Sequence, residues 1–310
     1  MRRWFGLVVL IGVVVGGVGC RAGGPDEVVV EPAVAEAVVD PESLVMRYRS
    51  GPRVTLARMV EAGARAEVLV VGETHGNLAG RAWTRAFWEA VRESREDAVL
   101  SLEFLERDQQ RALDDAWLFG KDWPVEGSMG FTFPLAGGGR VIASNAPRRY
   151  VSAYRKEGLA FVQRMTPEQR RLVVVPEEEG ELPMGRYAVD FENAMRSAMA
   201  GHGGGEAMSS EALAGFYRAQ LMWDATMADS IVRALADGHG PVVHVVGRFH
   251  SDFGGGLRYY LRRFLPGVSV MTVSLIDAEP PEDWLRGEDR FRADFVVYLR
   301  PRGDEAEADE

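Results

Sequence analysis

The sequence predicts an α/β fold in which a mostly parallel sheet of about six strands is flanked by helices and carries an inserted small helical domain. Short apolar runs without alternation indicate strands that are buried on both faces, as in parallel sheets. Segments with helical spacing lie between these runs and suit the crossovers that parallel strands require. With 310 residues and 46% hydrophobic content, the chain can bury a large core.

The first 19 residues are expected to be the signal peptide of a bacterial lipoprotein. Two arginines precede the apolar stretch Leu7–Val18, which is short for a membrane span, and the only cysteine of the chain, Cys20, follows small residues. Acylation of Cys20 would hold the protein on a membrane. Arg21 favours the outer membrane, on its periplasmic face or at the cell surface. The alternative is a secreted protein with an unmodified cysteine.

Changes in composition and periodicity predict how the rest of the chain divides into a tether, an α/β domain with a helical insertion, and a tail. Small, acidic and valine residues alternate with prolines in residues 20–50, which we expect to be a membrane tether. Residues 51–150 and 208–300 would form the α/β domain. Residues 151–207 break the alternation of strands and helices and are predicted to be the helical insertion. Residues 301–310 contain no large apolar side chain, so we expect a disordered acidic tail.

The stretch Glu67–Asn77, EVLVVGETHGN, predicts a strand that is followed at its carboxyl end by polar side chains. Its apolar run, Val68–Val71, is followed by Gly72 and by two candidate ligands, Glu73 and His75. In open α/β sheets, ligands gather beyond the carboxyl ends of the parallel strands. The pattern therefore places a candidate site at this end of the sheet.

Three further strands are expected to end in the same way: Ala98–Glu103, Arg140–Asn145, and Pro241–Gly247. Each residue alone is more typical of a loop or a cap, but the recurrence at four strand ends favours one shared site. Two last apolar segments, Val268–Leu275 and Phe295–Leu299, complete the predicted sheet. The residues that the four strand ends offer are Glu73, His75, Glu103, Asn145 and His250.

Four other polar residues are candidates for ligand contacts. Arg148 and Arg149 follow the third of these strands and suit a carboxylate or a phosphate, although two solvated arginines in a first helical turn are an equal alternative. Gln220 and Asp224 interrupt the apolar stripe of a long predicted helix, Glu211–Ala236. Because a buried carboxylate needs a partner, they either reach the site from the side or bond to neighbouring backbone.

The formal net charge is −10, and no basic stripe with interleaved aromatic residues is present. The composition therefore argues against nucleic acid as a partner.

Five motifs follow one another along the chain: Gly72–His75 with Asn77, Glu103 with residues 108–110, Asn145–Arg149, Gln220 with residues 223–228, and Gly247–His250. Together they resemble those of the ChaN-type haem-binding lipoproteins of the Tiki superfamily. The resemblance implies haem binding and iron acquisition, on a parallel sheet with a smaller helical domain. The sequence departs from the family pattern at Gly76, where an acidic residue is usual, and at Phe253–Gly256, where Tyr-Gly-Val-Pro is usual.

Two functions stay open on this sequence. For haem, His75 or His250 would ligate the iron and the two arginines would hold propionates, with an outer-membrane haem receptor and a second copy of the chain as further partners. For a metal-dependent hydrolase, the paired GxxH motifs would hold Zn, Mn or Co and act on a small molecule or a peptide, as in metal-dependent proteases elsewhere in the superfamily. In that case His75, His250, Glu73 and Glu103 would be ligands, with Glu73 or Glu103 as the general base.

Overall fold

The computed structural model describes residue 40 and residues 43–120, 139–179, 185–201 and 209–299. The predicted signal peptide, Cys20, and the acidic tail lie outside the described residues, as does most of the predicted tether. None of the helices in the described ranges has the length and apolar character that a transmembrane span requires.

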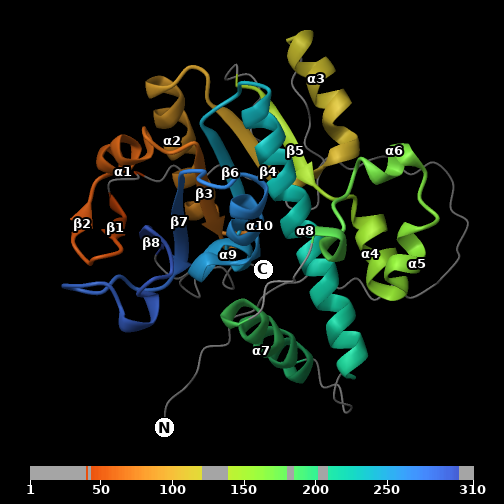
Figure 1. The fold of residues 1–310 in the computed structure, drawn as a ribbon. Coiled ribbons are helices and arrows are strands. Elements are labelled where there is room, and N and C mark those ends of the chain that lie inside the picture. The colour runs from red at the N-terminus through yellow and green to blue at the C-terminus, as the bar shows by residue number, and fades with distance from the viewer. Residues whose placement is uncertain (1–39, 41–42, 121–138, 180–184, 202–208, 300–310) are drawn as a thin grey trace, which may run out of the picture.

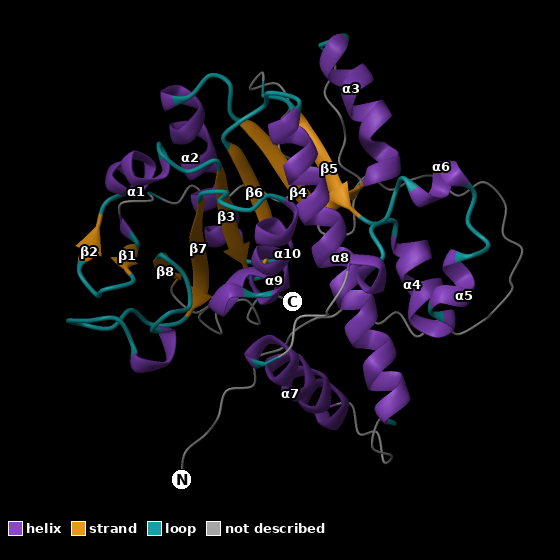
Figure 2. Cartoon of the chain, in the orientation of Figure 1, coloured by secondary structure: helices purple, strands orange, loops and turns teal. Residues whose placement is uncertain are grey.

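An eight-stranded sheet forms the centre of the described structure, in the order β2-β1-β8-β7-β3-β6-β4-β5 (Figures 1 and 2). All pairings from β8 to β5 are parallel, whereas β1 pairs antiparallel with both β2 and β8. This confirms the predicted α/β class and the mostly parallel sheet. The strands are β1 (Val45–Tyr48), β2 (Arg53–Val54), β3 (Val68–Glu73), β4 (Val99–Glu106), β5 (Val141–Asn145), β6 (Val242–Gly247), β7 (Val270–Asp277) and β8 (Phe295–Leu299).

The six predicted strands are β3 to β8, whereas β1 and β2 were not predicted. Strand β1 lies inside the segment 20–50 that was predicted to be a tether, so the predicted boundary at residue 50 is too late. Arg47 made this strand hard to recognise, because an arginine is rarely buried without partners. Its guanidinium is buried and donates to the carbonyl oxygens of Gly51, Pro281, Glu282 and Asp283.

Helices cover both faces of the sheet (Figure 1). Alternate residues of β3 point to opposite faces: Leu69 and Val71 join a core with α1, α2 and α3, while Val68 and Val70 join a core with α8 and α10. The helices are α1 (Leu56–Gly63), α2 (Leu78–Ser94), α3 (Gln110–Leu118), α4 (Arg148–Glu157), α5 (Leu159–Val162), α6 (Pro167–Arg170), α7 (Arg186–Gly201), α8 (Ser210–Ala236), α9 (Arg248–Ser251) and α10 (Gly256–Phe264).

Helix α2 illustrates why these segments are helical. Asn77 caps it, since its side-chain oxygen accepts a hydrogen bond from the Gly80 N–H at 2.8 Å. Trp83, Phe87 and Val91 follow at four-residue steps and are buried against the sheet. The turn before α2 therefore has a fixed geometry, and this turn carries the residues that follow the end of β3.

Helices also occupy the described parts of residues 148–201. Tyr154 of α4 and Val162 of α5 form a small core with Ala219 and Met222 of α8. Helix α7 lies apart from α4 and α5 and approaches α9 (Figure 1). The long helix α8 thus borders both the sheet and this helical layer.

Candidate functional site

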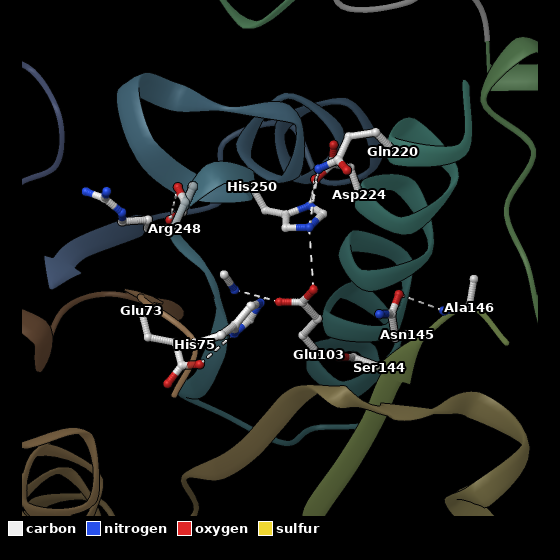
Figure 3. Close-up of polar contacts among 12 residues, drawn as sticks. Glu73, His75, Glu103, Ser144, Asn145, Ala146, Gln220, Asp224, Arg248 and His250 are labelled. Carbon is white, nitrogen blue, oxygen red and sulfur yellow. Dashed lines mark hydrogen bonds and ion pairs between the residues drawn. The ribbon is translucent and has the colours of Figure 1, made fainter. Parts of the chain in front are cut away.

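The carboxyl ends of three adjacent strands bring four of the predicted residues together (Figure 3). Strands β3, β6 and β4 are neighbours in that order and share one direction. Glu73 ends β3, His75 lies two residues beyond it, Glu103 belongs to β4, and His250 lies in α9, directly after β6. We call these four residues, together with Asp224, the His–Glu cluster.

Glu73 and His75 form the first pair of the cluster. The Oε1 atom of Glu73 lies 2.9 Å from Nδ1 of His75, and Glu73 is buried. Burial raises the pKa of Glu73, against the effect of the imidazole. Burial alone would lower the pKa of His75, but the hydrogen bond with Glu73 and the charge of Glu103 outweigh it and raise that pKa. The ring edge of His75 also contacts Phe104, with centroids 5.5 Å apart.

His250 lies between two carboxylates. Its Nδ1 is 2.7 Å from Oδ1 of Asp224, and its Nε2 is 3.5 Å from Oε1 of Glu103. Burial opposes protonation, but the two negative charges prevail and raise the pKa of His250 to about 10. Burial alone would also raise the pKa of Glu103. The charge of His250 and a hydrogen bond from the Gly247 N–H at 2.5 Å outweigh burial and lower this pKa to about 2. At neutral pH this pair is therefore ionised.

Asp224 and Gln220 both reach the cluster from α8, which answers the question that the sequence left open. Besides His250, Asp224 accepts a hydrogen bond from the Tyr187 hydroxyl at 2.6 Å, and burial raises its pKa. The Gln220 amide donates to the Tyr187 oxygen at 3.2 Å. Tyr187 belongs to α7 and was not singled out in the sequence. No local pattern marks it, because its partner lies 37 residues along the chain.

Two glycines allow these side chains to approach the backbone. A Cβ atom at Gly256 would overlap Oδ2 of Asp224, so the site has no room for any side chain there. A Cβ atom at Gly247 would lie 2.9 Å from Nε2 of His75 and 3.4 Å from Oε2 of Glu103. The absence of a side chain at Gly247 thus lets His75 and Glu103 approach the backbone there closely.

The other predicted contacts lie away from the cluster. Asn145 accepts a hydrogen bond from the Ala146 N–H at 2.9 Å. Arg148 and Arg149 are exposed in the first turn of α4, and Arg149 pairs with Asp108 at 2.6 Å. Between these three side chains and the His–Glu cluster, the described structure shows no hydrogen bond or ion pair. Their roles stay predictions.

The described residues contain no group of three or more His, Cys, Asp or Glu side chains placed to hold a metal ion. In the His–Glu cluster, Glu73 pairs with His75, and His250 pairs with Glu103 and Asp224. The geometry thus lends no support to the predicted Zn, Mn or Co site.

A model of the family described as "Haem-binding uptake, Tiki superfamily, ChaN" matches residues 59–123 and 131–261. The chain belongs to this family. The match includes every predicted site residue except Cys20, which lies before it. It confirms the resemblance that the five motifs indicated.

Solved structures with a similar fold include one described as cofacial haem binding to ChaN of Campylobacter jejuni. That chain is 14% identical, with a TM-score of 0.59, and the alignment covers 82% of this chain and 96% of that one. A protein from Bacillus cereus (10% identity, TM-score 0.42, covering 76% and 88%) and the type III effector HopBA1 (12%, 0.41, covering 85% and 100%) are more distant. No curated protein matches the sequence.

Proposed function

We propose that this chain binds haem in iron acquisition, as a lipoprotein held on the outer membrane through acylated Cys20. Membership of the haem-binding uptake family supports the haem ligand. The similar fold of Campylobacter jejuni ChaN, whose structure is described as binding haem, is consistent with this ligand. The apolar stretch before Cys20 supports the anchor.

The observation that carries the haem assignment is the free side of the His75 ring. Glu73 holds Nδ1, which orients the ring and makes Nε2 the more basic nitrogen for a metal. Nε2 has no hydrogen-bond partner among the described residues, and it lies close to Gly247, where a Cβ atom would be 2.9 Å away. The His75 side chain is 25% exposed, in contrast to the buried Glu73 that holds it.

His250 does not fit the same role. Both of its ring nitrogens face carboxylates, and its side chain is 8% exposed. We assign His250 to holding Glu103 and Asp224 in place. When bound, haem would supply an iron that the imidazole of His75 would hold. Arg148 and Arg149 are the candidates for the propionates, and Arg149 would have to release Asp108 to serve.

A hemin titration of residues 20–310, followed by the Soret band, tests the site. We expect saturable binding by the wild type and at least tenfold weaker binding by His75→Ala. Gly247→Ala should also bind at least tenfold more weakly, because its methyl group would come within 2.9 Å of Nε2 and displace the His75 ring. His239→Ala, at the opposite end of the strands, is the matched control and should bind like the wild type. An unchanged affinity of His75→Ala would refute the axial role, and absence of a saturable shift would refute haem binding.

Membrane anchoring needs a separate experiment, in which the full chain is expressed in a bacterium with labelled palmitate. The wild type should carry the label and fractionate with the outer membrane. Cys20→Ser should lose the label and appear in the soluble fraction. A Cys20→Ser protein that still fractionates with membranes would contradict the anchor and leave the haem result untouched.

A further inference from the structure

A cleft runs along the edge strand β5, and no residue of the His–Glu cluster lines it. It has a volume of about 270 Å3 and lies between the edge strand β5, helix α8 and the segment after α6. This volume is close to the lower end of the roughly 300–1,000 Å3 that small-molecule sites occupy. The lining residues on which the argument depends are Arg107, Arg140, Ile142, Arg171, Leu172 and Arg233.

Arg107 gives the cleft a rigid, buried positive charge. Its side chain is only 8% exposed and donates to Ser230 Oγ at 2.8 Å, to the Thr226 carbonyl at 2.7 Å and to Asp229 at 2.6 Å. Burial lowers the pKa of Arg107 to about 10, so the guanidinium stays protonated at neutral pH. Asp229 also forms an ion pair with Arg233 at 2.8 Å, so one carboxylate is shared by two arginines that line the cleft.

Arg140 and Arg171 supply the charges at the mouth of the cleft. Arg140 donates to Nε2 of His239, so this imidazole must carry its proton on Nδ1, and Asp114 lies 3.6 Å from the Arg140 guanidinium. Arg171 is exposed and forms no ion pair with any described residue. With their partners Asp229 and Asp114 and the lining Asp237 counted, four arginines face three carboxylates, which leaves an excess of one positive charge in a chain of net charge −10.

The remaining walls are apolar. Ile142 of β5, Leu172 just after α6, and Ala234 of α8 line the cleft together with the charged groups. Guanidinium groups bind carboxylates and phosphates through paired hydrogen bonds, and apolar walls favour a ligand with a hydrocarbon part. This combination differs from the His–Glu cluster, which is built from carboxylates and imidazoles.

We propose that this cleft binds a small organic anion, with its phosphate or carboxylate group on Arg140 and Arg171 and its apolar part on Ile142 and Leu172. Arg140 and His239 shortly precede β5 and β6, whereas Arg107 directly follows β4, so the cleft extends along β5. The His–Glu cluster lies at the carboxyl ends of β3, β6 and β4. None of its residues lines the cleft, so the proposal does not rest on haem binding.

Calorimetric titration of residues 20–310 with phenyl phosphate, benzoate and inorganic phosphate tests the proposal. We expect saturable binding of phenyl phosphate or benzoate, with about tenfold or greater loss of affinity in Arg140→Gln and in Arg171→Gln, because each removes a charge-assisted hydrogen bond. Leu172→Ala should weaken phenyl phosphate more than inorganic phosphate. Which of the two aromatic probes binds more tightly identifies the preferred acid group.

Arg263→Gln is the matched control, since Arg263 is an exposed arginine of α10 outside the cleft. It should bind the probes like the wild type, and circular dichroism should show that all variants are folded. Absence of saturable binding by both aromatic probes would overturn the proposal. So would an equal loss of affinity in the control and in the cleft variants, which would indicate nonspecific charge attraction.

Discussion

Replacing Asp224 by asparagine should destabilise the protein and change how its stability depends on pH. Asparagine keeps the shape of the side chain and can still bond to the Tyr187 hydroxyl, but it removes the charge that faces Nδ1 of His250 at 2.7 Å. His250 would then have Glu103 alone as a counter-charge, at 3.5 Å. Protonated His250 therefore becomes less stable in the folded state, and its pKa should fall.

The magnitude follows from the pKa of His250. The pKa of His250 is about 10 in the folded protein, against an ordinary value of 6.5. At about 1.4 kcal/mol per pKa unit, this difference corresponds to a contribution of roughly 5 kcal/mol to the free energy of unfolding. Because the pKa is raised on folding, this contribution is fully present below pH 6.5 and is lost as the pH rises through 10. Removing one partner of a buried pair costs about 3–5 kcal/mol, and the remaining Glu103 favours the lower end, about 3 kcal/mol at pH 7.

Urea unfolding of the wild type and of Asp224→Asn between pH 7 and pH 10 measures both effects. The wild type should lose several kcal/mol of unfolding free energy across this range, and the variant should start lower and change less. Asp237→Asn, an exposed carboxylate just after α8, is the matched control and should follow the wild type. Equal slopes for the wild type and Asp224→Asn would refute a His250 that stays protonated between two carboxylates.

Three further substitutions probe the packing around the site by chemical denaturation. Gly256→Ala should lose about 1–3 kcal/mol, because its Cβ would overlap Asp224; unchanged stability would mean that this contact relaxes at no cost. Trp83→Ala, which removes a fully buried ring stacked on Phe87, should lose about 3–5 kcal/mol, and a loss below about 1 kcal/mol would contradict a close-packed core. Asn77→Ala should lose about 1 kcal/mol through the cap of α2, whereas Asn77→Ser should recover most of it if capping is the cause.

Apolar runs were sufficient to predict the six parallel strands because these strands are largely buried on both faces. In β3 and β6 every residue is buried, so no alternation was needed to recognise them. Strands β1 and β2 have four and two residues, and β1 contains Arg47. Their place in the sheet depends on pairing with β8, near the far end of the chain, and on carbonyl groups of residues 281–283. No local pattern contains that information.

The meeting of Glu73, Glu103 and His250 was predictable because parallel register places the ends of neighbouring strands at one edge. The interruption of an apolar helical stripe likewise marked Asp224. The pattern could not predict that the two histidines have different contacts. His75 has one carboxylate contact, and its Nε2 is free of hydrogen bonds within the described structure. His250 has a carboxylate at each ring nitrogen. These contacts depend on side-chain pairing and on the close approach of His75 to Gly247, and neither can be derived from the spacing of residues along the chain.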